Sequence, residues 1–304
     1  MTSAALQGVA PLTHLGVIQA AGPDAASFLH SQLTQDFASL GAGEARLAAL
    51  CTARGRMIAS FIGIRPEPER ILLLCSRDIL TATLKRLSMF VLRAKVQLTD
   101  ASESFALYGL AGPAVAGNGV DPAATQGLCM AVGDASVVSL HPADGVARAL
   151  WIAPAGHAAP SGVMLDESLW QWSEIRSGIV TLTAPVIEAF VPQMLNYESV
   201  GGVNFKKGCY PGQEVVARSQ FRGTLKRRTC LMRADAPVMA GQEVFSEADA
   251  AQPVGIVAQA AAAPDGDWAA LVSMQVAALE GSGLHAGTAA LTVEPLPYPL
   301  LEYI

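Results

Sequence analysis

The segment VNFKKGCYPGQEVVAR, residues 203–218, is the most informative part of this 304-residue chain. Cys209 follows a pair of lysines and precedes a proline-glycine turn that ends at Gly212, after which a helix is expected to begin at Gln213. Positive charge from Lys207 and from the helix N-terminus would favour the thiolate form of Cys209. The segment therefore predicts a reactive thiol, with a small buried side chain at a turn as the alternative.

The same segment opens a basic run in an otherwise acidic protein. Between Lys206 and Arg233 the chain has eight basic side chains and one acidic side chain, Glu214. The whole chain has a net charge of −6 and a pI of about 5.4, which argues against nucleic-acid binding by general phosphate neutralisation. Such a run is typical either of a solvated face or of a site for an anionic ligand.

The apolar composition does not indicate a membrane protein. Hydrophobic residues make up 51% of the chain and its mean hydropathy is +0.36. Gly, Pro or charged residues nevertheless interrupt every apolar stretch before the roughly 18 residues that a spanning helix needs. The N-terminus also lacks the basic and apolar regions of a signal peptide. We therefore expect a soluble, cytoplasmic protein with no membrane partner.

The cysteine and histidine spacing indicates no resident metal. Neither a CxxC pair nor a histidine pair at ligand spacing is present, so no disulfide framework or zinc ribbon is expected. Transient ligation of a cluster through Cys209, shared with a partner, stays open. The five cysteines are Cys51, Cys75, Cys129, Cys209 and Cys230.

Hydrophobic periodicity predicts an α+β protein of more than one domain. In the first third, strands are expected over residues 17–20, 45–50, 56–64 and 71–74, and helices over 25–33 and 79–90. A further helix is expected over 169–177. From about Thr224 the pattern changes to short strands at 228–232, 254–257, 271–276 and 289–293, typical of a small barrel or sandwich. We predict an α+β core over residues 1–223, made of two interleaved subdomains, and a C-terminal β-barrel over 224–304.

Residues 203–218 resemble the signature by which YgfZ-type folate-binding proteins are identified. The Lys-Gly-Cys-Tyr-x-Gly-Gln-Glu core, from Lys207 to Glu214, is highly specific to that family. Shorter segments resemble the family in the same order, at residues 28–36, 51–56, 176–179, 191–196 and 221–228. The resemblance implies the fold of the glycine-cleavage aminomethyltransferase, or T protein, with a tetrahydrofolate site in the centre of the N-terminal portion.

The resemblance also suggests which residues form the site. A pterin needs a flat slot with polar edges, and its glutamate tail needs cations. We predict Cys209 and Lys207 as the catalytic pair. Ordinary packing of the tryptophan and solvation of the arginines are the alternatives. The candidate folate contacts are Arg54, Arg56, Trp172, Arg176, Gln213, Glu214 and Arg218.

Two functional classes follow from the resemblance. The first is a tetrahydrofolate-binding factor that assembles or repairs iron-sulfur enzymes, including those that modify tRNA, with these proteins or their assembly factors as partners. The second is a folate-dependent aminomethyltransferase or other one-carbon transferase. In the transferase an asparagine starts a run that ends in a catalytic aspartate, whereas this chain has LCSRD at residues 74–78, without the asparagine and with Asp78 too early. The first class is therefore favoured.

Overall fold

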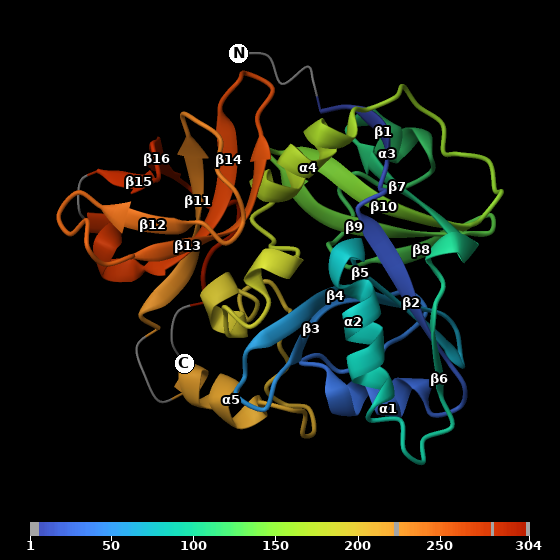
Figure 1. Ribbon diagram of the computed structural model, residues 1–304. Helices are drawn as coiled ribbons and strands as arrows, with labels where there is room; N and C mark the ends of the chain where they lie inside the picture. The colour runs from blue at the N-terminus through green and yellow to red at the C-terminus, as the bar shows by residue number, and fades with distance from the viewer. Residues whose placement is uncertain (1–5, 222–224, 281–282, 302–304) are drawn as a thin grey trace.

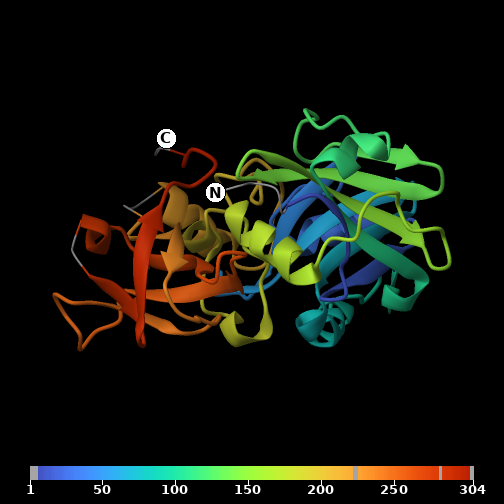
Figure 2. The ribbon, with the colours of Figure 1, turned by 90° about the horizontal axis from the view of Figure 1, so that it is seen from above.

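Two five-stranded antiparallel sheets and a closed barrel make up the protein (Figure 1), in a computed structural model that describes residues 6–221, 225–280 and 283–301. Seen from above, the barrel lies at one end of the molecule and the two sheets at the other (Figure 2). The α+β class and the closed C-terminal barrel are confirmed. The predicted domain boundary between residues 223 and 224 lies outside the described residues.

The first sheet has the order β3-β4-β5-β2-β6. Its strands are β2 (Leu15–Ala21), β3 (Ala45–Cys51), β4 (Met57–Glu67), β5 (Arg70–Ser76) and β6 (Gln97–Asp100). The helices α1 (Ala25–Gln32) and α2 (Arg77–Ser88) contribute buried apolar side chains to one of its cores. α2 begins and ends two residues earlier than the helix expected over residues 79–90. The other elements predicted in this region are confirmed.

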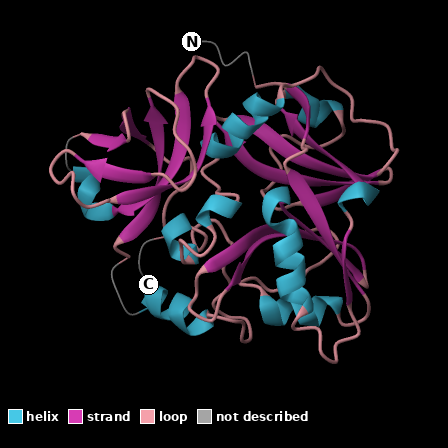
Figure 3. Cartoon of the chain, in the orientation of Figure 1, coloured by secondary structure: helices cyan, strands magenta, loops and turns pink. Residues whose placement is uncertain are grey.

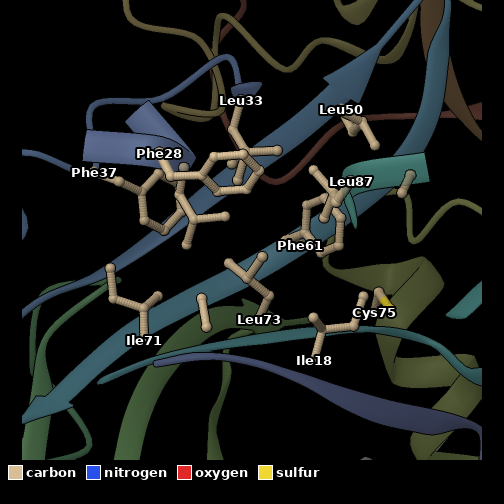
Figure 4. Close-up of a cluster of buried hydrophobic side chains, with 14 of the residues drawn as sticks. Ile18, Phe28, Leu33, Phe37, Leu50, Phe61, Ile71, Leu73, Cys75 and Leu87 are labelled. Carbon is tan, nitrogen blue, oxygen red and sulfur yellow. The ribbon is translucent and has the colours of Figure 1, made fainter. Parts of the chain in front are cut away.

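Strand β5 is buried on both faces, as its unbroken run of apolar residues predicts. Successive side chains of a strand point to opposite faces. Ile71 and Leu73 enter the core beneath α1 and α2, where Figure 4 shows Leu73 near Phe61 and Ile71 near Phe37. Leu72 and Leu74 enter a second core shared with the other sheet. The two sheets are thus joined by apolar packing through β5.

The second sheet has the order β1-β7-β10-β9-β8. Strand β1 precedes all strands of the first sheet in sequence, but it pairs with β7, which follows them. The second sheet therefore contains segments from both sides of the first sheet in the sequence. Its strands are β1 (Gly8–Pro11), β7 (Phe105–Ala111), β8 (Cys129–Val132), β9 (Ala135–Ala143) and β10 (Val146–Pro154), and its helices are α3 (Pro113–Gly117) and α4 (Glu167–Arg176). Trp170 of α4 packs onto Gly109, where an added Cβ would lie 2.4 Å from the indole ring.

The barrel closes in the order β11-β14-β13-β12-β15-β16. Figure 3 shows it as an almost entirely β unit, in contrast to the helix-bearing sheets. Its strands are β11 (Arg227–Ala234), β12 (Glu243–Ser246), β13 (Gly255–Ala262), β14 (Trp268–Gln275), β15 (Leu284–Ala286) and β16 (Ala289–Glu294). The remaining elements are α5 (Gln213–Phe221) and the 3₁₀ turns Ser102–Ser104, Ala184–Val186, Pro192–Leu195 and Val276–Glu280. None of the described helices has the length and apolarity that a membrane crossing requires.

A buried ion pair joins the barrel to the segment that precedes residues 203–218. Arg228 of β11 pairs with Glu198, and their side chains are 8% and 0% exposed. Ser199 Oγ also donates to Glu198 Oε1 at 2.9 Å. Removing one partner would leave a buried charge without compensation.

We therefore expect Arg228→Met to lower the free energy of unfolding by roughly 3–5 kcal/mol, the usual cost of breaking a buried pair. Arg77→Met is the control, because Arg77 and Glu103 form an exposed pair worth at most about 1 kcal/mol. Urea denaturation of both variants measures the difference. Equal, small losses would show that Glu198 is not an uncompensated charge in the variant.

Candidate functional site

Lys207 anchors the loop of residues 203–212 to the end of α1. Its Nζ donates hydrogen bonds to the carbonyl oxygen of His30 and, at 2.8 Å, to that of Leu33. The last carbonyls of a helix have no partner within the helix, and a cation there also interacts favourably with the helix dipole. One side chain thus satisfies the C-terminus of α1 and fixes the loop that carries Cys209.

The same ammonium group is electrostatically close to the thiol. Burial lowers the pKa of Lys207 to about 8, and the nearby Asp36 carboxylate and Cys209 thiol partly offset this shift. Nζ also lies 4.7 Å from the centre of the Tyr210 ring. Lys207 therefore still carries a proton at neutral pH and supplies positive potential beside Cys209.

Of the five cysteines, all within the described residues, Cys209 alone is exposed. Burial raises the pKa of the Cys51 and Cys75 thiols to about 12, and that of the Cys129 and Cys230 thiols to about 11. A thiolate is the nucleophilic form, so these four are poor nucleophiles at neutral pH. Of the five thiols, that of Cys209 is therefore the one open to a reagent in solution.

Two glycine turns interlock next to this thiol. Gly212 has φ +82°, and a Cβ added to it would lie 2.4 Å from Thr52 O and 2.7 Å from Gly55 Cα. Gly55, in the β3–β4 turn, has φ +72° and packs against Val215 of α5. Only glycine, which has no Cβ, fits this close approach at Gly212. As expected, α5 begins at Gln213.

The candidate folate contacts do not surround one cavity. Arg56 Nη1 donates to Ala189 O at 2.6 Å, while Arg54 is exposed in the β3–β4 turn. On α5, which begins at Gln213, Glu214 and Arg218 form an exposed ion pair at 2.5 Å.

The two candidates on α4 lie where the second sheet meets the barrel. Arg176 pairs with Asp144 at 2.8 Å and also with Glu294 of β16, and its guanidinium lies 5.9 Å from the ring centre of the half-buried Trp172. Arg176 thus links the core to the barrel. None of the seven candidate folate contacts is among the described residues that line the central cavity.

That cavity lies between the two sheets and has a volume of about 310 Å³. It falls within the range of small-molecule sites, roughly 300–1,000 Å³. Residues of β3, β4, β9, β10 and α4 contribute to its wall. Its polar lining includes Gln35, Arg46, His141, Arg148, Glu174 and Thr181.

Glu174 is held so that one carboxylate oxygen is free. Its Oε1 accepts from Trp170 Nε1 at 3.0 Å and lies 3.1 Å from His14 Nε2. Its Oε2 is buried and finds no partner in the described residues. Burial alone would lower the pKa of His14, but the hydrogen bonds and charges of Glu174 and Glu167 raise it to about 9. His14 is therefore protonated and holds Glu174 in place.

Arg148, another residue of the cavity wall, also has an unsatisfied polar group. Its side chain is buried, its guanidinium lies 4.4 Å from the centre of the Trp170 ring, and its Nε has no partner in the described part of the chain. Burial lowers the pKa of Arg148 to about 10, and Glu174 opposes the shift. Burial and the charge of Arg148 also lower the pKa of His141. Buried polar groups without partners are uncommon and call for an explanation.

Sequence reasoning missed Glu174, Arg148 and His14 because they come from three distant elements. One local signal existed. Glu174 stands four residues after Trp170 in the helix expected over residues 169–177, so both lie on one helical face. An acid on a face with a buried tryptophan is a candidate for a polar site.

Asp78, the carboxylate closest to the transferase pattern in the sequence, makes its hydrogen bonds outside the cavity. Asp78 Oδ1 accepts from Ser76 Oγ at 2.6 Å and Oδ2 accepts from Ala184 N at 2.8 Å, and Asp78 is not among the described residues that line the cavity. Within the described residues, no three or more His, Cys, Asp or Glu side chains are arranged to hold a metal ion.

Comparison with known proteins agrees with this fold. Residues 5–117 match the family model described as the GCVT N-terminal domain. The glycine cleavage system aminomethyltransferase T from Bartonella henselae has a TM-score of 0.68 at 18% identity, covering 98% of this chain and 88% of that chain. The fold is that of the glycine-cleavage aminomethyltransferases.

The relatives found by sequence similarity identify the family more narrowly than the fold does. The tRNA-modifying protein YgfZ of Edwardsiella ictaluri is 30% identical over 237 residues, 72% of this chain and 69% of that protein. Its counterpart from Serratia proteamaculans is 29% identical over 300 residues, 92% and 89% of the two chains. The chain belongs to the YgfZ family.

The lowered pKa of Lys207 gives a pH prediction. Between pH 8 and 10.5 the folded state releases the Lys207 proton while the unfolded state keeps it, so stability rises with pH through this window. The difference in unfolding free energy between wild type and Lys207→Met should therefore grow in favour of the wild type from pH 7.5 to 9.5, by about 1 kcal/mol after solvent screening is allowed for. Urea denaturation at both pH values measures it. A constant or shrinking difference would contradict the lowered pKa.

Proposed function

We propose that this protein binds tetrahydrofolate, or a related reduced folate, in the central cavity. We further propose that it supports the assembly or repair of iron-sulfur enzymes, including those that modify tRNA, with Cys209 as its reactive thiol. The observation that carries the folate proposal is that two residues of the cavity wall, Glu174 and Arg148, each keep a buried polar atom, Oε2 and Nε, without a partner in the described residues.

These two groups are chemically suited to a pterin. The pterin ring carries an amino group beside a ring N–H, and a carboxylate oxygen with free lone pairs accepts from either. It also carries ring and carbonyl acceptors, which suit an arginine N–H. The cavity volume of about 310 Å³ suits the ring system, with the glutamate tail directed toward cations such as Arg46.

The tRNA part of the proposal has separate support. The relatives that match most of the chain are named tRNA-modifying protein YgfZ. The exposed Cys209, in the segment that resembles the family signature, supplies a soft sulfur donor or nucleophile. Iron-sulfur clusters are bound by cysteine thiolates, so a client cluster is a chemically reasonable target for this thiol.

One-carbon transfer is the alternative, since the fold is shared with an aminomethyltransferase and Glu174 places a carboxylate in the cavity. Asp78 is engaged elsewhere, as described above. Incubation of the purified protein with tetrahydrofolate and an aminomethyl donor distinguishes the two classes. Release of formaldehyde equivalents would favour the transferase.

Folate binding is tested at Glu174. Glu174→Gln should weaken tetrahydrofolate binding about tenfold or more, because a charged acceptor in a buried site is lost. Glu167→Gln is the matched control, since Glu167 also bonds His14 but is not among the described lining residues. Thermal-shift titration measures both, because a ligand that binds only the native state raises its melting temperature.

Equal affinity in Glu174→Gln and wild type would remove Glu174 from the folate site. The absence of any melting-temperature shift in the wild type, at ligand concentrations well above micromolar, would contradict folate binding itself.

The role of Cys209 is tested in a deletion strain. Cys209→Ser should keep the melting temperature and the folate-induced shift, because the side chain is exposed, yet fail to restore the activity of iron-sulfur enzymes. Cys129→Ser is the control with the reverse pattern. It buries a hydroxyl, should lose roughly 1–3 kcal/mol of stability, and should restore activity as far as it folds. Full rescue by Cys209→Ser at normal expression would contradict the thiol role.

A further inference from the structure

His30 faces the cysteine-bearing loop with one ring nitrogen and a carboxylate with the other. Its Nδ1 lies 2.7 Å from Asp36 Oδ1, and both side chains are 23% exposed. Its Nε2 makes no hydrogen bond or ion pair within the described residues. A Cβ added to Gly208, the residue before Cys209, would lie 3.4 Å from this nitrogen. A free imidazole nitrogen therefore lies next to the place that a side chain at Gly208 would occupy, one residue before the thiol.

Other contacts fix this arrangement. Lys207 donates to the carbonyl oxygens of His30 and Leu33, so the loop is tied to the backbone of the histidine. Asp36 is itself held, because Oδ2 accepts from Ser39 Oγ at 2.7 Å and Oδ1 from Ser39 N at 3.2 Å. Two charged groups thus contact His30: Asp36, from the loop after α1, at the ring, and Lys207, from the cysteine loop, at the carbonyl oxygen.

The carboxylate determines what His30 can do. Burial alone would raise the pKa of Asp36, but hydrogen bonds from Ser39 and the interaction with His30 lower it to about 2, so Asp36 is ionised at neutral pH. A carboxylate at Nδ1 favours the tautomer that carries its proton there. Nε2 then has a free lone pair, and the imidazolium formed when it accepts a proton is stabilised by Asp36.

We propose that His30, oriented by Asp36, is the proton acceptor for Cys209. The Sγ–H proton moves to Nε2, leaving a thiolate and an imidazolium bonded to Asp36. Consecutive Cα atoms are about 3.8 Å apart, so rotation of the Cys209 side chain or one bridging water can connect Sγ with Nε2. This inference rests on the proposed reactivity of Cys209. It adds a catalytic base, His30, and a positioning residue, Asp36.

Alkylation of the native protein by iodoacetamide tests the proposal. The thiolate attacks the methylene carbon, the S–C bond forms, the C–I bond breaks and iodide leaves. The other four cysteines are buried, so the modified Cys209 peptide, measured by mass spectrometry, reports the rate, and Cys209→Ser gives the blank. Rates are taken from pH 6 to 10 for wild type, His30→Gln and Asp36→Asn. His285→Gln in the barrel is the control histidine.

At pH 7 we expect His30→Gln to react about tenfold more slowly than wild type, as for a one-unit shift of the profile. Asp36→Asn should also be slower, and the control should match wild type. At about pH 10, where ordinary thiols are ionised without help, all variants should converge. His30→Gln should fold, because its side chain is partly exposed and the Lys207 anchor uses the backbone oxygen of His30.

Equal rates for His30→Gln and wild type at pH 7 would overturn the inference. So would an equal slowing at every pH, since that indicates a displaced loop and not a lost proton acceptor. A wild-type rate no higher than that of a small model thiol at pH 7 would overturn the proposed reactivity of Cys209 as well. A fast wild type with an equally fast variant overturns only the role of His30.

Discussion

The contact between the Lys207 ammonium and the last carbonyls of α1 is the interaction on which the site depends. It joins residues that are 177 positions apart in sequence and gives the cysteine loop a fixed place on the first sheet. Burial lowers the pKa of this lysine to about 8, so it remains protonated at neutral pH with little margin. The interlocked turns at Gly55 and Gly212 then fix the start of α5. Loop, helix and thiol are positioned by one cation and one close backbone approach.

Much of the fold could be predicted from local patterns, because those patterns report burial directly. The unbroken apolar run at residues 71–74 lies within a strand buried on both faces, and the short segments after residue 224 form the barrel. The site could not be predicted in this way, because it is formed by contacts between residues that are far apart in sequence. Arg176 forms ion pairs with Asp144 and Glu294, which no local sequence pattern reveals. Arg148 is buried against Trp170 because β10 and α4, far apart in sequence, pack together. A charged residue looks the same in the sequence whether it binds a ligand, pairs with a carboxylate or is solvated by water.

The segment Thr34–Asp36 connects the central cavity with the thiol site. Gln35 lines the cavity and donates to Gly201 O at 2.6 Å, while Asp36, its neighbour, holds His30. Thr34 Oγ1 donates to Gly202 O at 2.6 Å, which ties the same segment to the chain leading to Cys209. A ligand that moved Gln35 would therefore act on backbone shared with Asp36. These hydrogen bonds form one contiguous set of groups between the cavity wall and Asp36.

The cavity between the sheets and the cysteine loop are lined and held by different residues. Cys209 is not among the described residues that line the central cavity, and its loop is fixed to α1 and to the β3–β4 turn. Moving the loop from this place would expose the carbonyl oxygens of His30 and Leu33 and release the Lys207 cation. That rearrangement costs several hydrogen bonds at once. The architecture therefore favours two separate chemistries, ligand binding between the sheets and thiol chemistry at the surface.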